Sequence, residues 1–376
     1  MTECVGILKS MDFPFQIEDV EKNLADELMQ HYTGIFCELT GFVRVGPKGY
    51  FLPQKYKEEA TDIYNIPIRT DDVFVVTYPR SGTTWTQELV WLLKNDLDFE
   101  AAKATSIAAR FPYLEFSTLV HPVYEQIMRY ENKSNPERLK IIEAAMLPSA
   151  VKVSKIPSPR FIKSHLPISL LPPTLLDTAK VVYVARDPRD AAISHYHLSR
   201  LYKIQGAPED FKTYWNYLIR GLHHFAPILD HVKEAWRLRD HPNLLFVFYE
   251  ELSKDLPSVV RRIAKFLKKS PTKEQVEKLC EHLSFKNFKE NSAVNEMLLG
   301  KIDFINKGEP PFMRKGKVGD WRDYFDEEMI QQADRWLGDN LADTDLRFPS
   351  WNLPCVGGKV ANPINVAHIR ITQGRT

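Results

Sequence analysis

Short apolar runs alternate with longer amphipathic stretches along most of the chain. Four runs of five to seven mostly apolar residues, each bounded by polar or turn residues, predict buried β-strands. These strands are expected at residues 73–79, 160–164, 180–185 and 244–249. Helix-length stretches separate them, and this alternation is typical of a parallel sheet buried on both faces. The pattern predicts an α/β fold of three layers, with helices flanking a central, mostly parallel sheet.

Capping residues mark where several helices begin. Thr272 and Gln275 have the spacing of a capping box ahead of an apolar stripe. Asp255 precedes a proline at the start of another predicted helix. Nearer the N-terminus, two apolar runs flank a turn with two glycines, which predicts a short hairpin over residues 42–52.

Two segments depart from the alternation of strands and helices. Within residues 117–157, His121 and Asn135 each precede a proline and open a helical stretch, so we expect a helical insertion over the sheet edge. This insertion is either a lid or a set of packing helices without a gating role, and both alternatives stay open. Residues 352–376 lack periodicity and predict a poorly ordered tail. Residues 1–351 are expected to form a single domain.

Composition narrows the class of protein. The 50 basic and 49 acidic side chains nearly cancel, so no overall field favours nucleic acid as a partner. No apolar run reaches the roughly 18 residues of a membrane span, and the first eleven residues lack the apolar core of a signal peptide. The four cysteines show no metal-ligand spacing, which favours free thiols in a reducing compartment and a cytoplasmic protein. They are Cys4, Cys37, Cys280 and Cys355.

The polar loop Tyr78-Pro79-Arg80-Ser81-Gly82-Thr83-Thr84-Trp85 lies between a predicted strand and a helix-like run. Free backbone N–H groups and the positive end of a helix dipole favour an anion there. Arg80 adds a cation, and Gly82 allows close approach of a ligand. The loop lacks the second glycine and the lysine of a Walker A motif, so it predicts a phosphate-like ligand bound without the usual magnesium site. A capped turn without a ligand is the alternative for this loop alone.

Two further basic loops follow later in the chain. Residues 186–190 come directly after the 180–185 strand, at the edge where open α/β sheets bind ligands. Residues 312–321 hold three cations and two glycines, a combination suited to a phosphate. Each of these loops alone is also typical of a solvated surface. Together with the first loop, they predict a ligand with two separated anionic groups.

Four motifs, in this order and spacing, resemble the cytosolic sulfotransferases over roughly residues 30 to 350. They are Tyr78–Trp85, Lys163-Ser164-His165-Leu166-Pro167, Tyr183–Asp190 and Arg314–Trp321. The resemblance implies a P-loop-like fold and 3′-phosphoadenosine-5′-phosphosulfate (PAPS) as the sulfuryl donor, with no metal. It also implies a small hydrophobic hydroxyl compound as acceptor, with neither nucleic acid nor membrane as a partner.

The resemblance also assigns roles to residues. His165 matches the base that takes the acceptor's proton, a task suited to a group that titrates near neutrality. Lys163, Arg80 and Ser194 complete the implied catalytic set. The implied donor site consists of Arg80, Ser81, Gly82, Thr83, Thr84, Trp85, Arg186, Ser194, Tyr249, Leu283, Phe285, Phe312, Met313, Arg314, Lys315 and Gly316. The implied acceptor site consists of Tyr113, Phe116, His165 and Leu198. The other histidines of this region, His195, His197, His223 and His224, are expected to be structural.

The chain departs from the family pattern at three places. Arg80 stands where the family usually has lysine, and because arginine stays charged it can stabilise a leaving phosphate but not protonate it. The usual dimer motif is not matched after Trp321, so a homodimer stays open. The segment 117–157 is longer than usual, as in the insect branch that includes retinol dehydratase.

These departures leave alternative functions open. A dehydratase that eliminates water from an alcohol through a sulfated intermediate is one alternative. A nonenzymatic nucleotide or lipid binder is another. An ATP-dependent kinase is disfavoured because the Walker pattern is missing.

Overall fold

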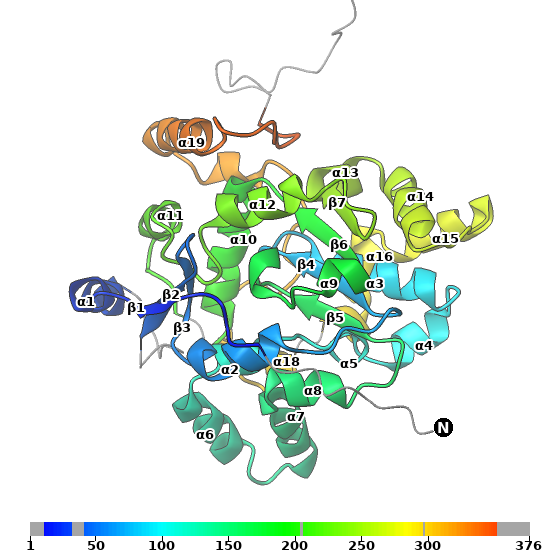
Figure 1. The fold of residues 1–376 in the computed structure, drawn as a ribbon, viewed down its shortest axis with the longest axis horizontal. Helices are drawn as coiled ribbons and strands as arrows, with labels where there is room; N and C mark the ends of the chain where they lie inside the picture. Colours follow the sequence, from blue (N-terminus) through cyan, green and yellow to red (C-terminus); the bar gives the residue numbers. More distant parts are fainter. Residues whose placement is uncertain (1–10, 32–40, 204–205, 296–297, 352–376) are drawn as a thin grey trace, which may run out of the picture.

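A four-stranded parallel sheet forms the centre of the molecule, as the sequence predicts (Figure 1). The computed structural model describes residues 11–31, 41–203, 206–295 and 298–351. Within them the strand order is β5-β4-β6-β7, and each neighbouring pair is parallel. The strands are β4 (Val73–Thr77), β5 (Phe161–Ser164), β6 (Lys180–Ala185) and β7 (Leu244–Phe248).

The register of these strands brings their carboxyl ends to one edge. Val75 of β4 lies between Lys163 of β5 and Val182 of β6, so all three chains leave the sheet on the same side. Two strands are shorter than expected there. β4 ends at Thr77, and β7 ends at Phe248 because Tyr249 begins helix α13 (Tyr249–Lys254). Loops rather than strands therefore line this edge, where ligands bind in open α/β sheets.

Alternate strand residues enter two separate hydrophobic cores. Phe74 and Val76 of β4 belong to one core, whereas Val73 and Val75 belong to the other. Because successive side chains of a strand point to opposite faces, the sheet is buried on both sides. Helices α10 (Pro188–Leu201), α12 (Ile228–Arg237) and α19 (Glu327–Asn340) join the first core. Helices α3 (Thr83–Lys94), α14 (Leu256–Phe266) and α15 (Lys273–His282) join the second, on the other side of the sheet in Figure 1.

The predicted caps are present at the helix starts. Thr272 and Gln275 form a reciprocal capping box at the start of α15. Asp255 accepts a hydrogen bond from the Ser258 N–H at the start of α14. Each pairing satisfies backbone donors that the helix itself leaves free.

Several further helices complete the described part of the fold. They are α1 (Lys22–His31), α2 (Tyr56–Tyr64), α4 (Phe99–Ala104), α5 (Ile107–Arg110), η1 (Phe116–Leu119), η2 (Ile168–Leu170), α9 (Leu175–Thr178), α11 (Phe211–Ile219), α16 (Phe285–Glu290), α17 (Ser292–Asn295), α18 (Leu298–Lys301) and η3 (Asp320–Asp323).

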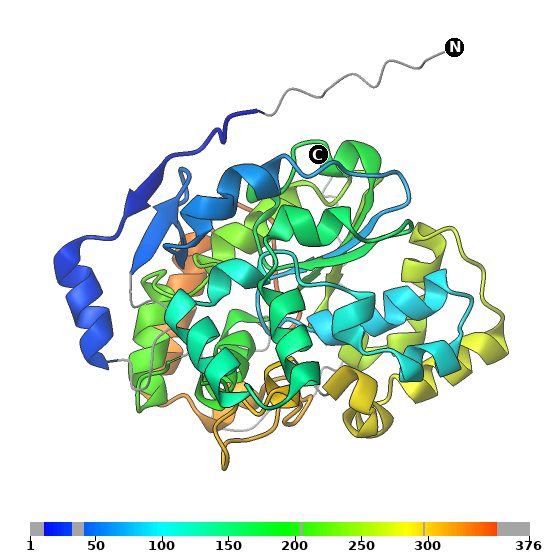
Figure 2. The same cartoon turned by 90° about the horizontal axis from the view of Figure 1, so that it is seen from below.

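The predicted hairpin belongs to a second, antiparallel sheet. Strands β2 (Phe42–Val45) and β3 (Tyr50–Pro53) pair as expected. A third strand, β1 (Ile17–Asp19), adds to β2, which the short polar sequence of β1 did not predict. Figure 2 shows this small sheet at the opposite end of the molecule from α14 and α15.

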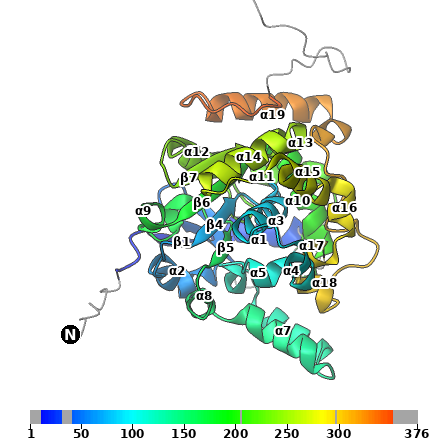
Figure 3. The same cartoon turned by 90° about the vertical axis from the view of Figure 1, so that its right-hand side faces the viewer.

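Three helices fill the segment predicted as an insertion: α6 (Pro122–Glu131), α7 (Pro136–Met146) and α8 (Ser149–Ser154). His121 and Asn135 cap α6 and α7 as expected. These helices lie on the side of the molecule away from α19 (Figure 3). Apolar side chains of α6 and α7 pack against the end of α10 and against residues 299–305, whereas Val153 of α8 joins the first core of the central sheet. The predicted tail, 352–376, lies outside the described residues. No helix in the described ranges is long and apolar enough to cross a membrane.

Candidate active site

A cavity of about 570 Å³ opens at the carboxyl edge of the central sheet. It brings together residues that are far apart in the sequence, from the loop after β4 to the basic loop near residue 315. Of the sequence-predicted site residues, only Ser81, which is 1 % exposed, does not line it. Those that line it are Arg80, Gly82, Thr83, Thr84, Trp85, Tyr113, Phe116, Lys163, His165, Arg186, Ser194, Leu198, Tyr249, Leu283, Phe285, Phe312, Met313, Arg314, Lys315 and Gly316.

The loop after β4 forms a tight turn into α3. Arg80 has a φ of 67° and Gly82 a φ of 99°, both in the left-handed region. A Cβ at Gly82 would lie 2.7 Å from Cδ2 of Tyr249, so only glycine fits there without displacing that ring. The Thr77 and Thr83 hydroxyls are 2.7 Å apart and tie the strand to the helix. The turn therefore presents the start of α3 to the cavity, where an anion is favoured.

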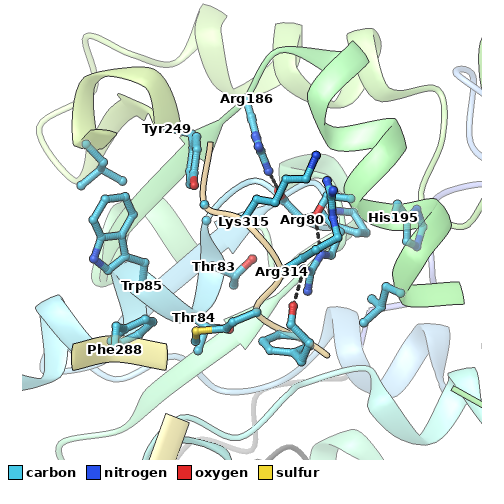
Figure 4. A pocket seen from close by; sticks show the side chains of 18 of the residues that line it. Arg80, Thr83, Thr84, Trp85, Arg186, His195, Tyr249, Phe288, Arg314 and Lys315 are labelled. Atoms are coloured by element: carbon cyan, nitrogen blue, oxygen red, sulfur yellow. Dashed lines mark hydrogen bonds between the residues drawn. The ribbon is translucent and has the colours of Figure 1, made fainter. Parts of the chain in front are cut away.

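Arg80 reaches across the cavity toward the later basic loops. Its Nε donates to the Ser194 hydroxyl at 2.9 Å, and its Nη2 donates to the carbonyl of Phe312 at 2.8 Å (Figure 4). Burial lowers the pKa of Arg80 to about 10, and the charges of Arg186 and Arg314 act in the same direction. Arg80 stays charged at neutral pH, and the three clustered cations favour a bound anion.

The later basic loops are held to each other and to the first loop. Arg186 donates to the carbonyls of Arg80 and Lys317, each at 3.1 Å, and stacks 4.2 Å from the Tyr249 ring centroid. Its buried Nε has no hydrogen-bond partner among the described residues. Arg314 and Lys315 both pair with Asp320.

Aromatic side chains form a slot beside these cations. The Trp85 indole N–H donates to the Leu283 carbonyl at 2.9 Å, and its ring lies 5.9 Å from that of Tyr249. Across the slot, a Cβ at Gly316 would lie 2.4 Å from Cδ2 of Phe285, and Gly316 has a φ of 63°. Phe285 is 41 % exposed, unusual for a large aromatic. An exposed ring facing a slot suits stacking on a flat base.

His165 follows β5 directly and turns one ring nitrogen into the cavity. Its Nδ1 lies 2.8 Å from the Thr77 carbonyl oxygen. Because a carbonyl only accepts, Nδ1 carries the proton and Nε2 holds a lone pair. No hydrogen bond to Nε2 is present within the described part of the chain. Burial, and then the charge of Lys163, hold the pKa of His165 well below its usual value, so the ring is neutral at pH 7.

Lys163 lies on β5, two residues before His165. Its Nζ lies 4.1 Å from the ring centroid of Tyr113, and burial lowers its pKa to about 8. Glu115, whose role the sequence did not reveal, lies behind both residues. Its Oε1 accepts the His165 main-chain N–H at 2.6 Å. The sequence signal for Glu115 was its position between Tyr113 and Phe116, the two predicted acceptor-site residues.

The far end of the cavity is apolar. Tyr113, Phe116 and Leu198 line it as predicted. Two of the histidines expected to be structural, His195 and His224, also line the cavity. His195 follows Ser194 on α10, and the i to i+4 spacing of Ser194 and Leu198 was the signal that this helix face looks into the site. The lining residues that were not predicted include Leu119, Tyr202, Phe225, Leu299 and Phe288.

Comparison with known proteins identifies the family. The sulfotransferase domain matches residues 70–345. This chain belongs to the sulfotransferase family. It is 36 % identical over 313 residues to luciferin sulfotransferase of Photinus pyralis, covering 82 % of this chain and 81 % of that protein. It is 33 % identical over 303 residues to sulfotransferase 1A1 of Canis lupus familiaris, covering 80 % and 94 %.

Solved structures agree with this assignment. Retinol dehydratase in a complex with retinol and PAP is 45 % identical, with a TM-score of 0.83, over 90 % of this chain and 100 % of that chain. The complex of retinol dehydratase with androsterone and the inactive cofactor PAP gives the same identity and TM-score. The predicted resemblance and the P-loop-like fold are confirmed. The chain is a sulfotransferase that uses PAPS.

The residues present fit this donor. Gly82 and Gly316 leave two concave positions that a Cβ would fill, each beside an aromatic ring. The buried Nε of Arg186 has no hydrogen-bond partner in the part of the chain that the structure describes, and a buried donor of this kind calls for an acceptor. No group of three or more His, Cys, Asp or Glu residues that could hold a metal occurs in the described ranges.

Proposed function

We propose that this sulfotransferase acts on the hydroxyl of a small hydrophobic alcohol or phenol, with His165 taking the acceptor's proton. The observation that carries the proposal is the position of His165: it lines a cavity that is cationic at one end and apolar at the other, and its Nδ1 is held by the Thr77 carbonyl. PAPS supplies the sulfuryl group when bound. The chain's own residues orient the two reactants and move one proton.

The cationic end divides into three proposed binding regions. The loop from Arg80 to Trp85 offers N–H groups and hydroxyls to the 5′-phosphosulfate. Trp85, Tyr249 and Phe285 form the slot proposed for adenine, with Leu283 beside it. The proposed 3′-phosphate site consists of Arg186, Ser194, Arg314, Lys315 and Gly316, with Phe312 and Met313 lining the loop before it.

Charge stabilisation and proton removal fall to different side chains. His165 is neutral and its Nδ1–H is held by Thr77, which leaves Nε2 ready to accept a proton. Arg80 and Lys163 supply positive charge where negative charge develops during transfer. Because Arg80 remains charged, it stabilises the leaving phosphate without protonating it.

The apolar end sets the proposed class of acceptor. Tyr113, Phe116 and Leu198 give it a largely aromatic and aliphatic wall, which suits steroids, phenols or isoprenoid alcohols. The solved retinol dehydratase complexes hold androsterone and retinol, which belong to these classes. Elimination through a sulfated intermediate is the second candidate, supported by the 45 % identity to retinol dehydratase.

We also propose that α6, α7 and α8 act as a lid within a single domain. Apolar side chains of α6 and α7 share a hydrophobic cluster with Phe116, Leu198 and Phe312, which line the cavity, so movement of these two helices would change its apolar end. The cytoplasmic location stays a prediction. A homodimer also stays open, because the usual dimer motif is not matched.

A screen with labelled PAPS tests the proposed reaction. Phenols, steroids and retinol are incubated separately with the protein, and products are identified by mass spectrometry. A stable sulfate ester is expected. An anhydro product from retinol would instead support elimination. Tight PAP binding without turnover of any acceptor would contradict the catalytic proposal and favour a binding protein.

A further inference from the structure

A buried carboxylate lies directly behind the proposed base. Glu115 is fully buried, with 0 % exposure. Its Oε1 accepts the main-chain N–H of His165 at 2.6 Å, and its Oε2 accepts the hydroxyl of Ser164 at 2.9 Å. The Ser164 hydroxyl in turn accepts the N–H of Leu166 at 3.0 Å. One carboxylate therefore holds three consecutive residues around the base.

The chain around Glu115 also forms the acceptor wall. The main chain of residues 112–114 runs beside β5: Leu114 N–H donates to the Lys163 carbonyl at 2.8 Å, and Lys163 N–H donates to the Pro112 carbonyl at 3.0 Å. The Tyr113 ring lies 5.2 Å from the His165 ring, edge to face. Glu115 is the N-cap residue of η1, whose Phe116 and Leu119 line the cavity. Glu115 therefore contacts the segments that carry the acceptor wall, Lys163 and His165.

Glu115 also opposes the effect of burial on Lys163. Burial lowers the pKa of Lys163 to about 8, the charge of Glu115 raises it, and the charge of Arg80 lowers it. Burial raises the pKa of Glu115 itself to about 7, so Glu115 is mainly ionised at pH 8. The titratable and charged groups that face Lys163 or Glu115 are Arg80, Tyr113, His165, Tyr56 and Lys152.

We propose that Glu115 is a positioning residue for sulfuryl transfer, which fixes the main chain of His165 and keeps Lys163 charged. The inference rests on the roles proposed above for those two residues. Glu115 itself does not line the cavity and acts only through its neighbours. Loss of its charge therefore shifts the pH at which Lys163 loses its proton, whereas loss of its geometry slows transfer at every pH.

Glu59 provides a matched control. It is also a buried carboxylate, and its Oε2 accepts a main-chain N–H and a serine hydroxyl, both from Ser149 at 2.7 Å. It lies on α2 and does not line the cavity. A purely structural role predicts similar behaviour for variants of Glu59 and Glu115. A positioning role predicts that only Glu115 variants change the pH profile.

The test compares kcat/KM against pH for wild type, Glu115→Gln and Glu59→Gln, with PAP binding measured to show that each variant is folded. In Glu115→Gln the amide oxygen can still accept the His165 N–H, the amide NH2 has to donate to the Ser164 hydroxyl, and the charge is lost. The alkaline limb is expected to move down by about one pH unit, with a roughly fivefold loss at pH 8. Glu59→Gln keeps the wild-type limb. A wild-type limb in Glu115→Gln would overturn the proposal.

A second variant covers the case in which Glu115→Gln does not fold. Glu115→Asp keeps the charge but shortens the reach, so kcat is expected to fall roughly tenfold or more while the alkaline limb stays in place. Wild-type kcat in Glu115→Asp would contradict the positioning role. His165→Ala is assayed alongside: if it is inactive while Glu115 variants match wild type, only this inference fails. If His165→Ala is fully active, the proposed function fails.

Discussion

At the scale of single residues, the site depends on how burial sets charge. His165 and Lys163 lie two positions apart, and burial lowers the pKa of both. Burial therefore favours the neutral imidazole of His165 and works against the charged ammonium of Lys163. Thr77 fixes which nitrogen of His165 carries the proton. These three residues define the window of pH in which a neutral base and a charged lysine coexist.

The pH dependence of kcat/KM follows from these shifts. His165 is active when neutral, and because its pKa lies well below 6.5 the acid limb is expected well below pH 6.5. Lys163 is active when charged, so the rate falls as pH rises through about 8. Initial rates with a phenol whose own pKa lies above 9.5 check both limbs between pH 5 and 9.5. An acid limb centred at 6.5 would show an unperturbed histidine.

Arg80 tests how much of the rate comes from fixed positive charge. Arg80→Ala removes the hydrogen bonds to Ser194 and Phe312 together with the charge. A fall in kcat of about 10²-fold is expected, similar to the loss of one oxyanion donor. Arg80→Lys keeps the charge and is the matched control, expected to lie between Arg80→Ala and wild type. Single-turnover rates decide, and a wild-type rate in Arg80→Ala would remove Arg80 from the mechanism.

At the scale of elements, the sequence predicted the sheet better than its borders. Apolar runs gave four strands, since each is buried on both faces, and capping residues gave the starts of α14 and α15. The ends of β4 and β7 were placed too late because the same polar and aromatic residues suit a strand end or a loop. Strand β1 was missed because its residues carry no apolar alternation and gain stability only from pairing with β2.

The basic loop before η3 offers a prediction at this scale. In Gly316→Ala the new Cβ would displace Phe285 and would occupy a φ of 63°, unfavourable by about 1–2 kcal/mol for an L side chain. Affinity for PAP is expected to fall roughly tenfold, corresponding to about 1.4 kcal/mol. Gly338→Ala in α19, where a Cβ meets nothing within 4 Å, is the control with unchanged affinity. Calorimetry measures the affinity of both variants for PAP. Equal affinities of Gly316→Ala and Gly338→Ala would contradict the assignment of this loop to the donor site.

At the scale of the whole molecule, the cavity lies where the layers and the loops meet. Its lining comes from segments between residues 79 and 317, so donor binding is expected to stabilise the fold as a whole. The four sequence motifs predicted the cationic end, because a phosphate site needs recognisable residue types at short spacing. The apolar end was predicted only in part: Phe225 and Leu299 are ordinary core residues in the sequence, and tertiary packing alone brings them to the site.

Donor binding should therefore raise the melting temperature. PAP at 100 times its dissociation constant adds about 2.7 kcal/mol to the free energy of unfolding, which corresponds to a rise of a few degrees. In Arg314→Ala that rise is expected to shrink while the melting temperature without PAP changes little, because Lys315 still pairs with Asp320 when the Arg314 side chain is removed. Thermal scans with and without PAP test this. A full PAP-induced rise in Arg314→Ala would contradict the assignment of this loop.

The rate of sulfuryl transfer by His165→Ala is the most direct test of the mechanism. We predict that kcat with a phenol acceptor falls by at least about 10²-fold, because the side chain that takes the proton is lost. Affinity for PAP should stay close to wild type, since the cations that hold it are unchanged. Transfer at the wild-type rate, with PAP binding intact, would show that the imidazole beside Thr77 is not the base.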